Sequence, residues 1–145
     1  SSSVRNTEAT QLLSYIKSKV PAGDYLVIGG DFNTGSRSEP ALGTLSKLVM
    51  TTDPYPTDRN GNGNTNASRA KPYDWVLTNG ALSAYQTPTV IGSSSFATGL
   101  VVDTRVYSPI SELSPALASD SGASQMQHMA VVRDFQIPSD TPAAF

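Results

Sequence analysis

The 145-residue chain contains no cysteine, only one histidine and few charged residues. Without cysteine it has neither a disulfide framework nor a thiolate metal site. Charged residues make up 15% of the chain, the formal net charge is −2, and lysine and arginine form no run. This composition excludes a broad basic surface for nucleic acid, so a polyanionic substrate would require a cation or a few placed side chains.

The sequence also has no apolar stretch long enough to cross a bilayer, which argues against a transmembrane segment. Hydrophobic residues make up 38% of the chain, too many and too regularly spaced for a disordered protein, and the length suits one domain over 1–145. Abundant Ser, Thr, Asn and Gly favour a secreted or periplasmic protein. The start at Ser1 rather than methionine suggests a processed product or a fragment.

The hydrophobic pattern predicts an α/β domain in which helices and strands alternate closely. Apolar residues recur at helical spacing over 6–20, with Asn6 or Thr7 as the cap, and again after Pro40. The continuous apolar stretch 25–30 predicts a strand covered on both faces. Further strands are expected over 73–78, 87–91, 100–102 and 128–137. Loops are expected over 51–70, 93–98 and 108–124, and a tail from about 138 to 145.

Three short motifs follow or begin these strands. Asp31 and Asn33 come directly after the first strand, where open α/β sheets place their ligands. Asp74 begins the next strong strand, and His128, the only histidine, stands at the entrance to the last one. A carboxylate that accepts from one ring nitrogen would orient the imidazole and favour its charged form.

Each of these residues also has a purely structural interpretation. Asp31 and Asn33 are consistent with an Asx turn that closes the strand. Asp74 could pair on the surface with a neighbouring basic residue, and a lone histidine such as His128 is more often structural than catalytic. Taken singly, none of the motifs decides between the two interpretations.

Taken in order, the motifs resemble the carboxy-terminal half of the endonuclease/exonuclease/phosphatase (DNase I-like) superfamily. Gly-Asp-Phe-Asn at 30–33 is the most specific element, followed by Tyr-Asp at 73–74 and His-x-x-Val-Val from 128. The resemblance extends over 6–135. It implies an α/β (α+β) fold that is half of a four-layer sandwich, with one mixed β-sheet and helices on one face. It also implies that a missing amino-terminal half, or a second copy of the chain, packs against this half.

The resemblance further implies a divalent-metal-dependent phosphodiester hydrolase that uses Mg²⁺ or Mn²⁺. Asp31 would position and deprotonate the attacking water, and Asn33 would hold that water and the developing charge. Asp74 would orient His128, and His128 would contact the scissile phosphate. The substrate would be a nucleic acid or a phospholipid headgroup. Because other site residues of the family come from the amino-terminal half, this chain alone is expected to be inactive.

The sequence departs from the family pattern next to the histidine. The family usually has an aspartate near a metal at the position of Gln127, and glutamine offers a neutral oxygen but no charge. A second metal site at Gln127 is therefore doubtful. Asp120 is a possible substitute for the missing aspartate, although the simpler interpretation is a loop residue. These departures support the alternative function, a non-catalytic relative or inactive fragment that acts as a structural or binding module.

The Asn- and Gly-rich loop suggests two further sites. Asp58, Asn60 and Asn62 match the start of a calcium-binding loop, although its twelfth position holds Arg69 rather than glutamate. A calcium-stabilised binding module is thus a third hypothesis, and a flexible loop is its plain alternative.

In DNase I-like enzymes the loop before the Tyr-Asp strand approaches the substrate. This position makes three polar residues of the loop candidates for contact with a phosphate. The candidates are Asn66, Ser68 and Arg69.

Overall fold

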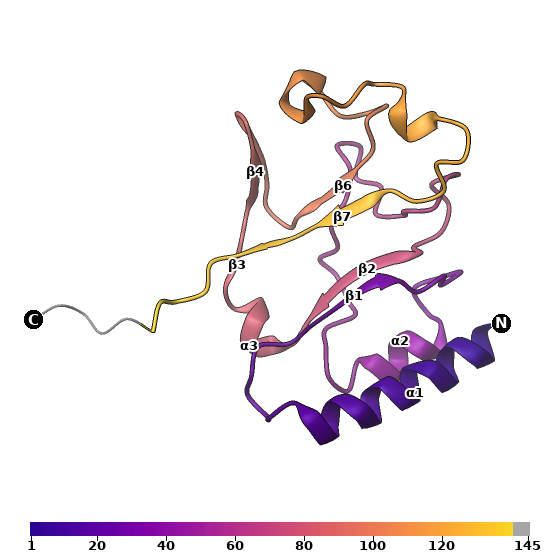
Figure 1. The fold of residues 1–145 in the computed structure, drawn as a ribbon, viewed down its shortest axis with the longest axis vertical. Helices are drawn as coiled ribbons and strands as arrows, with labels where there is room; N and C mark the ends of the chain where they lie inside the picture. Colours follow the sequence, from indigo (N-terminus) through magenta and orange to yellow (C-terminus); the bar gives the residue numbers. More distant parts are fainter. Residues whose placement is uncertain (141–145) are drawn as a thin grey trace, which may run out of the picture.

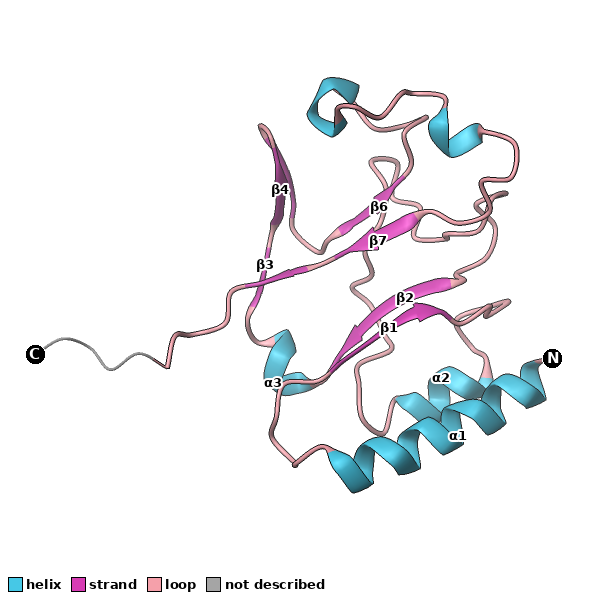
Figure 2. Ribbon diagram, in the orientation of Figure 1, coloured by secondary structure: helices cyan, strands magenta, loops and turns pink. Residues whose placement is uncertain are grey.

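The computed structural model describes residues 1–140, so residues 141–145 of the expected tail lie outside the described part of the chain. Figures 1 and 2 show the arrangement of the helices and strands. In chain order these are α1 (Ser2–Lys19), β1 (Val27–Asp31), α2 (Pro40–Leu45), β2 (Asp74–Thr78), α3 (Gly80–Ser83), β3 (Gln86–Thr87), β4 (Thr89–Ile91), β5 (Ser94–Phe96), β6 (Leu100–Val102), η1 (Ile110–Leu113), η2 (Asp120–Gly122), β7 (Ala130–Val132) and β8 (Asp134–Phe135).

Helix α1 begins four residues earlier than its apolar pattern predicts. Ser1 is the N-cap, and its hydroxyl accepts a hydrogen bond from the Val4 backbone N–H at 3.4 Å. Asn6 and Thr7 therefore lie inside the helix, which corrects their expected role as caps. The Asn6 side chain instead accepts a hydrogen bond from the Thr44 hydroxyl at 2.6 Å, which links α1 to α2.

The main hydrophobic core lies between these two helices and the antiparallel ladder β1–β2. Ile28, Trp75 and Leu77 point from the ladder toward the helices and are no more than 8% exposed. Leu42 and Ile16 are among the helix residues that pack in the same cluster. Full burial of such side chains contributes about 1.5–3 kcal/mol each, so this packing fixes β1 and β2 against the helices.

Strand β1 is buried on one face only, which corrects the expected burial on both faces. Ile28 is its only buried residue. Gly29 and Gly30 add no side chains, and within the described residues β1 pairs with β2 alone. The opposite face and the outer edge of β1 are consequently open.

The fold is α+β, as predicted, but its described strands do not form one mixed sheet. They form four two-stranded antiparallel ladders: β1–β2, β3–β8, β4–β5 and β6–β7. Strand β7 lies next to β2, with α1 and α2 on the far side of the β1–β2 ladder (Figure 1). The strand expected over 128–137 is divided, because the chain leaves β6 at Arg133 and pairs with β3 only afterwards.

Two short elements, strand β5 and helix α3, were not predicted. Strand β5 lies in the expected loop 93–98 and forms a hairpin with β4 around Gly92, which has a φ of +57°. Asn79 caps α3 by accepting from the Leu82 backbone N–H at 3.1 Å. The stretches 51–70 and 108–124 are largely loop, as expected, the second with the short turns η1 and η2.

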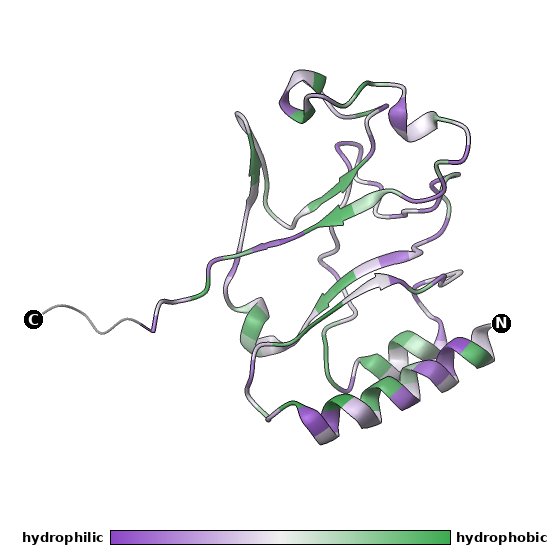
Figure 3. Ribbon diagram, viewed as in Figure 1, coloured by the Kyte–Doolittle hydropathy of each residue, from purple (hydrophilic) through white to green (hydrophobic). Residues whose placement is uncertain are grey.

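Hydropathy follows the same arrangement. Apolar residues gather on β6, β7 and the inner sides of the helices (Figure 3). Within residues 1–140, none of the helices combines the length and the apolar character that a bilayer crossing needs.

Candidate active site

Asp31 and Asn33 lie together at the carboxyl end of β1. The Asn33 backbone N–H donates to Asp31 Oδ1 at 2.8 Å, and its side-chain Nδ2 donates to Asp31 Oδ2 at 2.9 Å. Asn33 has a φ of 50°, a left-handed conformation that asparagine tolerates better than most residues. The expected Asx turn is therefore present. It holds the Asn33 amide next to the Asp31 carboxylate, whose side chain is 38% exposed.

Asp74 and His128 form a pair beside this turn. The strand register places Asp74 directly opposite Asp31 across the β1–β2 ladder. His128 Nδ1 lies 3.2 Å from Asp74 Oδ1 and 3.1 Å from Asp74 Oδ2. His128 Nε2 lies 3.8 Å from Asp31 Oδ2. The imidazole thus stands between two carboxylates, one near each ring nitrogen.

These side chains border an open cleft of about 480 Å³ between the β1–β2 ladder and residues 128–131. Asp31, Asp74 and His128 each offer a ligand atom, and these atoms lie within 4.8 Å of one another. Within the described residues this is the only such group of acidic and histidine side chains. Asp74 is 17% and His128 36% exposed, so a solvent molecule or a phosphate group can reach the cluster. The structure therefore brings Asp31, Asp74 and His128 to one rim, and Asn33 is hydrogen-bonded to Asp31 beside it.

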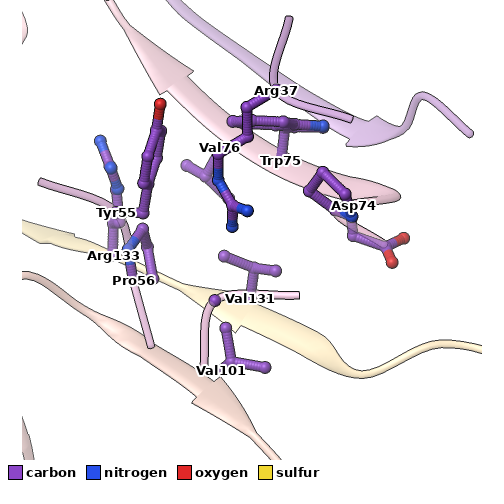
Figure 4. A pocket seen from close by; sticks show the side chains of 11 residues that line it. Arg37, Tyr55, Pro56, Asp74, Trp75, Val76, Val101, Val131 and Arg133 are labelled. Carbon is purple, nitrogen blue, oxygen red and sulfur yellow. The ribbon is translucent and has the colours of Figure 1, made fainter. Parts of the chain in front are cut away.

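The interior behind Asp74 is closed to ligands. A cavity of about 20 Å³ lies between β2 and the β6–β7 ladder, room for about one water molecule (Figure 4). Arg37 is one of the residues that line it, with its guanidinium carbon 4.6 Å from the centre of the Tyr55 ring. Asp74 turns its carboxylate away from this cavity (Figure 4). Access to Asp74 is consequently from the side of His128.

Buried hydrogen bonds hold the turn after β1 in place. Thr34 is fully buried; its hydroxyl donates to the Pro72 carbonyl and accepts from Trp75 Nε1, the latter at 2.8 Å. Thr34 follows Asn33, and Pro72 and Trp75 lie on either side of Asp74. These bonds therefore link the Asn33 turn to the segment that carries Asp74.

A second tether joins the same turn to α1. Glu39 accepts from the Gly35 backbone N–H at 2.5 Å and pairs with the Arg5 guanidinium at 2.6 Å. The hydrogen bond from Arg5 holds the pKa of Glu39 below its usual value, against the opposing effect of burial. Glu39 therefore remains ionised and keeps the turn attached to the helix.

Arg69 does not point toward the cluster, as a phosphate contact would. Its side chain is 10% exposed, and its Nη1 lies 2.5 Å from Asp103 Oδ2 and 3.0 Å from Asp58 Oδ2. Its Nε and Nη2 donate to the carbonyls of Asn64 and Asn62. The guanidinium is thus committed to the loop interior, and we do not retain Arg69 as a substrate-binding residue.

Asp103 is the centre of this ion network. Hydrogen bonds from Arg105 lower its pKa to about 2, with a further contribution from Arg69, and they outweigh the opposing effect of burial. The carboxylate is therefore charged over the whole neutral and mildly acidic range. Asp103 was not predicted from the sequence, although its place at the end of the apolar strand 100–102 could have revealed it.

Asp58, the first expected calcium ligand, already has other partners. Asp58 Oδ1 accepts from the backbone N–H groups of Asn60 and Asn62 at 2.8 and 3.0 Å, and Oδ2 pairs with Arg69. The Asn62 side chain is likewise engaged, since it accepts from Asn64 N and donates to the Arg69 carbonyl. A Ca²⁺ ion would have to displace the guanidinium, so calcium does not enter our proposed function.

The other candidate residues lie at the surface. Asn66 Oδ1 accepts from the backbone N–H groups of Ala70 and Lys71, and its Nδ2 donates to the Ser68 hydroxyl. Asn66 also forms an isolated antiparallel bridge with His128, so this loop does border the cluster. Contact of Asn66 and Ser68 with a phosphate stays a prediction.

Gln127, the doubtful metal ligand, is exposed. Asp120, the possible substitute, lies in η2, where its Oδ2 accepts from the Leu117 backbone N–H at 2.8 Å. Neither residue belongs to the group formed by Asp31, Asp74 and His128. A second metal site therefore has no donor set within the described residues.

Comparisons of this chain with protein-family models, curated proteins and solved structures gave no match. The geometry of the cluster and the motif resemblance are therefore the observations that bear on function.

Proposed function

We propose that this chain supplies catalytic side chains of a divalent-metal-dependent phosphodiester hydrolase of the DNase I-like type. One observation carries the proposal: the only histidine stands between two carboxylates at the rim of an open cleft, with an amide attached to one of them. Hydrolysis of a phosphodiester needs a positioned water, a charge-stabilising donor and fixed geometry around phosphorus. The cluster contains residue types for each of these tasks.

In this proposal the two ring nitrogens of His128 have different tasks. Asp74 accepts from Nδ1–H, which orients the ring. Nε2 faces Asp31 and is free to donate to a phosphate oxygen when the ring is protonated. Asp31 accepts the proton of the attacking water. Asn33 holds the Asp31 carboxylate with its amide and can turn the same group toward the developing charge.

The donor set also fits a divalent metal. Two carboxylates suit Mg²⁺ or Mn²⁺. Asp31 and Asp74 would hold the ion, because their ligand atoms lie within 4.8 Å of each other and of a His128 ring nitrogen. His128 Nε2 would remain available beside the ion as the donor to the phosphate. A bound cation would offset the charge of the phosphate, which the chain's own net charge of −2 does not do. The proposed substrate is a phosphodiester in a nucleic acid or a phospholipid headgroup.

We further propose that a second unit completes the site, either an amino-terminal half or another copy of the chain, which would make the whole a four-layer sandwich. The outer edge of β1 presents backbone groups that no described strand pairs. Val27 on that strand is 53% exposed, and Val4 and Tyr15 on α1 are 52% and 64% exposed. An edge strand with apolar neighbours is a common site for the addition of another strand.

Hydrolysis of a chromogenic phosphodiester tests both parts of this proposal. We expect the full-length protein to be active with Mg²⁺, to lose activity in EDTA and to regain it with excess Mg²⁺. We expect residues 1–145 to be inactive as a monomer. Activity that persists in EDTA would refute the metal requirement, and full activity of the 145-residue chain as a monomer would refute the need for a second unit.

A non-catalytic relative is the second candidate function, and one observation favours it. Both oxygens of Asp31 already accept hydrogen bonds from Asn33, as in a purely structural turn. Gln127 also adds no charge beside His128. Under this alternative the full-length protein would not hydrolyse phosphodiesters at any metal concentration.

A further inference from the structure

Thr65 connects the two chain segments that carry Asp74 and His128. It lies in the loop between α2 and β2 and is 1% exposed. Its hydroxyl oxygen accepts a hydrogen bond from the Asp74 backbone N–H at 2.8 Å. Its carbonyl oxygen accepts from the Met129 backbone N–H at 2.7 Å, one residue after His128. A single buried residue is thus bonded to both sides of the Asp74–His128 pair.

The loop that carries Thr65 is itself anchored on two sides. The Thr65 backbone N–H donates to the Lys71 carbonyl at 2.9 Å, which closes the loop. The next residue, Asn66, forms the antiparallel bridge with His128. The ion network of Arg69 with Asp103 then fixes the far side of the loop. Thr65 therefore has little freedom to move independently of these anchors.

We propose that Thr65 is a positioning residue for the Asp74–His128 pair, an inference whose catalytic meaning rests on the proposed function. The two Nδ1–oxygen distances are 3.1 and 3.2 Å, at the long end of the hydrogen-bond range, so a small shift of Asp74 would break the contact. Without the Thr65 hydroxyl, the Asp74 N–H would lose its buried acceptor and the start of β2 would relax.

The tautomer of His128 reports this effect directly. A neutral imidazole carries its proton on Nδ1 or on Nε2, and the hydrogen bond to Asp74 selects the Nδ1–H form. Because His128 is the only histidine, ring ¹⁵N chemical shifts of the chain give one unambiguous set of signals. This readout depends on the position of Asp74 and not on general stability.

The experiment compares Thr65→Val with Thr65→Ser and with a matched control, Thr104→Val. Valine removes the hydroxyl and keeps the shape, whereas serine keeps the hydroxyl. Thr104 is also buried, and its hydroxyl also accepts from a backbone N–H, that of Ser121 at 2.9 Å, but it has no contact with the cluster. Ring ¹⁵N shifts are measured at a pH where the imidazole is neutral, and Tm is measured for each variant.

We expect the Nδ1–H tautomer to dominate in the wild type, Thr65→Ser and Thr104→Val. In Thr65→Val we expect the Nε2–H tautomer to rise severalfold, while its Tm falls about as far as that of Thr104→Val. In the full-length protein kcat of Thr65→Val should fall about 100-fold with little change in KM. A wild-type tautomer in a destabilised Thr65→Val variant would overturn the proposal.

Three further outcomes complete the test, and the last two separate this inference from the proposed function. If Thr65→Val does not fold, hydrogen exchange of the Asp74 amide in the wild type decides: protection comparable to that of Met129 supports the role of Thr65, and fast exchange overturns it. If the full-length protein proves inactive but the tautomer shifts as expected, Thr65 positions the pair and the hydrolase proposal fails. If the protein is active and the tautomer is insensitive to Thr65→Val, the hydrolase proposal stands and the positioning role of Thr65 fails.

Discussion

Replacing His128 by alanine in the full-length protein should lower kcat for phosphodiester hydrolysis by about 10³-fold. The imidazole is the only side chain placed to donate between the two carboxylates, so the variant loses both the donor and the orientation supplied by Asp74. Asp31→Asn should have an effect of similar size, because an amide cannot accept the proton of the attacking water. Both changes are made at partly exposed positions, and circular dichroism should show intact folds.

Asp24→Asn is the matched control for the aspartate substitution. Asp24 is exposed in the turn before β1 and lies outside the cluster. Its replacement also removes one negative charge, and it should leave kcat unchanged. Equal losses in Asp24→Asn and Asp31→Asn would show that net charge, rather than the position of the carboxylate, explains the result.

Arg69→Met should destabilise the chain by about 3–5 kcal/mol, the usual result of removing one partner from a buried ion pair. The guanidinium is 10% exposed, and the side chains of Asp58 and Asp103 are 4% and 3% exposed. Methionine fills much of the space but leaves Asp58 without its cation. Urea unfolding at neutral pH measures the loss, and Arg105→Met, at a position 37% exposed, should lose less.

The stability that this ion network contributes should depend on pH in a definite direction. The pKa of Asp103 is about 2 in the folded chain, against an ordinary value of 3.8. Because the folded pKa is the lower one, the stabilisation is complete above about pH 4 and disappears as pH falls through about 2. Because Arg105 contributes most to this low pKa, the difference in stability between wild type and Arg105→Met should narrow over that interval. A difference that is constant between neutral pH and pH 2 would contradict the assigned network.

The elements that were predicted correctly are those with strong local patterns. The helical stripe of α1 and the apolar runs of β1 and β2 are set by neighbouring residues, so the sequence alone reveals them. The meeting of Asp31 with Asp74 and His128 was expected from the motif order, and the β1–β2 register realises it. Strand pairing joins residues that are distant in sequence, so local patterns do not reveal it. One mixed sheet was therefore expected, whereas the described strands form four short ladders.

The errors at Arg69 and β5 have specific physical causes. Arg69 stands in a polar loop, and nothing nearby indicates that two distant carboxylates draw its side chain inward. Strand β5 consists of small polar residues that resemble a loop, and only its pairing with β4 makes it a strand. Thr65 was missed because its importance comes from two backbone N–H groups distant in sequence.

The most direct test of the central claim is the effect of Mn²⁺ on the ring signals of His128 in the 145-residue chain. If Asp31 and Asp74 hold a divalent ion beside His128, Mn²⁺ added well below one equivalent should broaden these signals, and Asp31→Asn should prevent the broadening. Ring signals that stay sharp while Mn²⁺ broadens resonances elsewhere in the chain would contradict a metal site at this cluster.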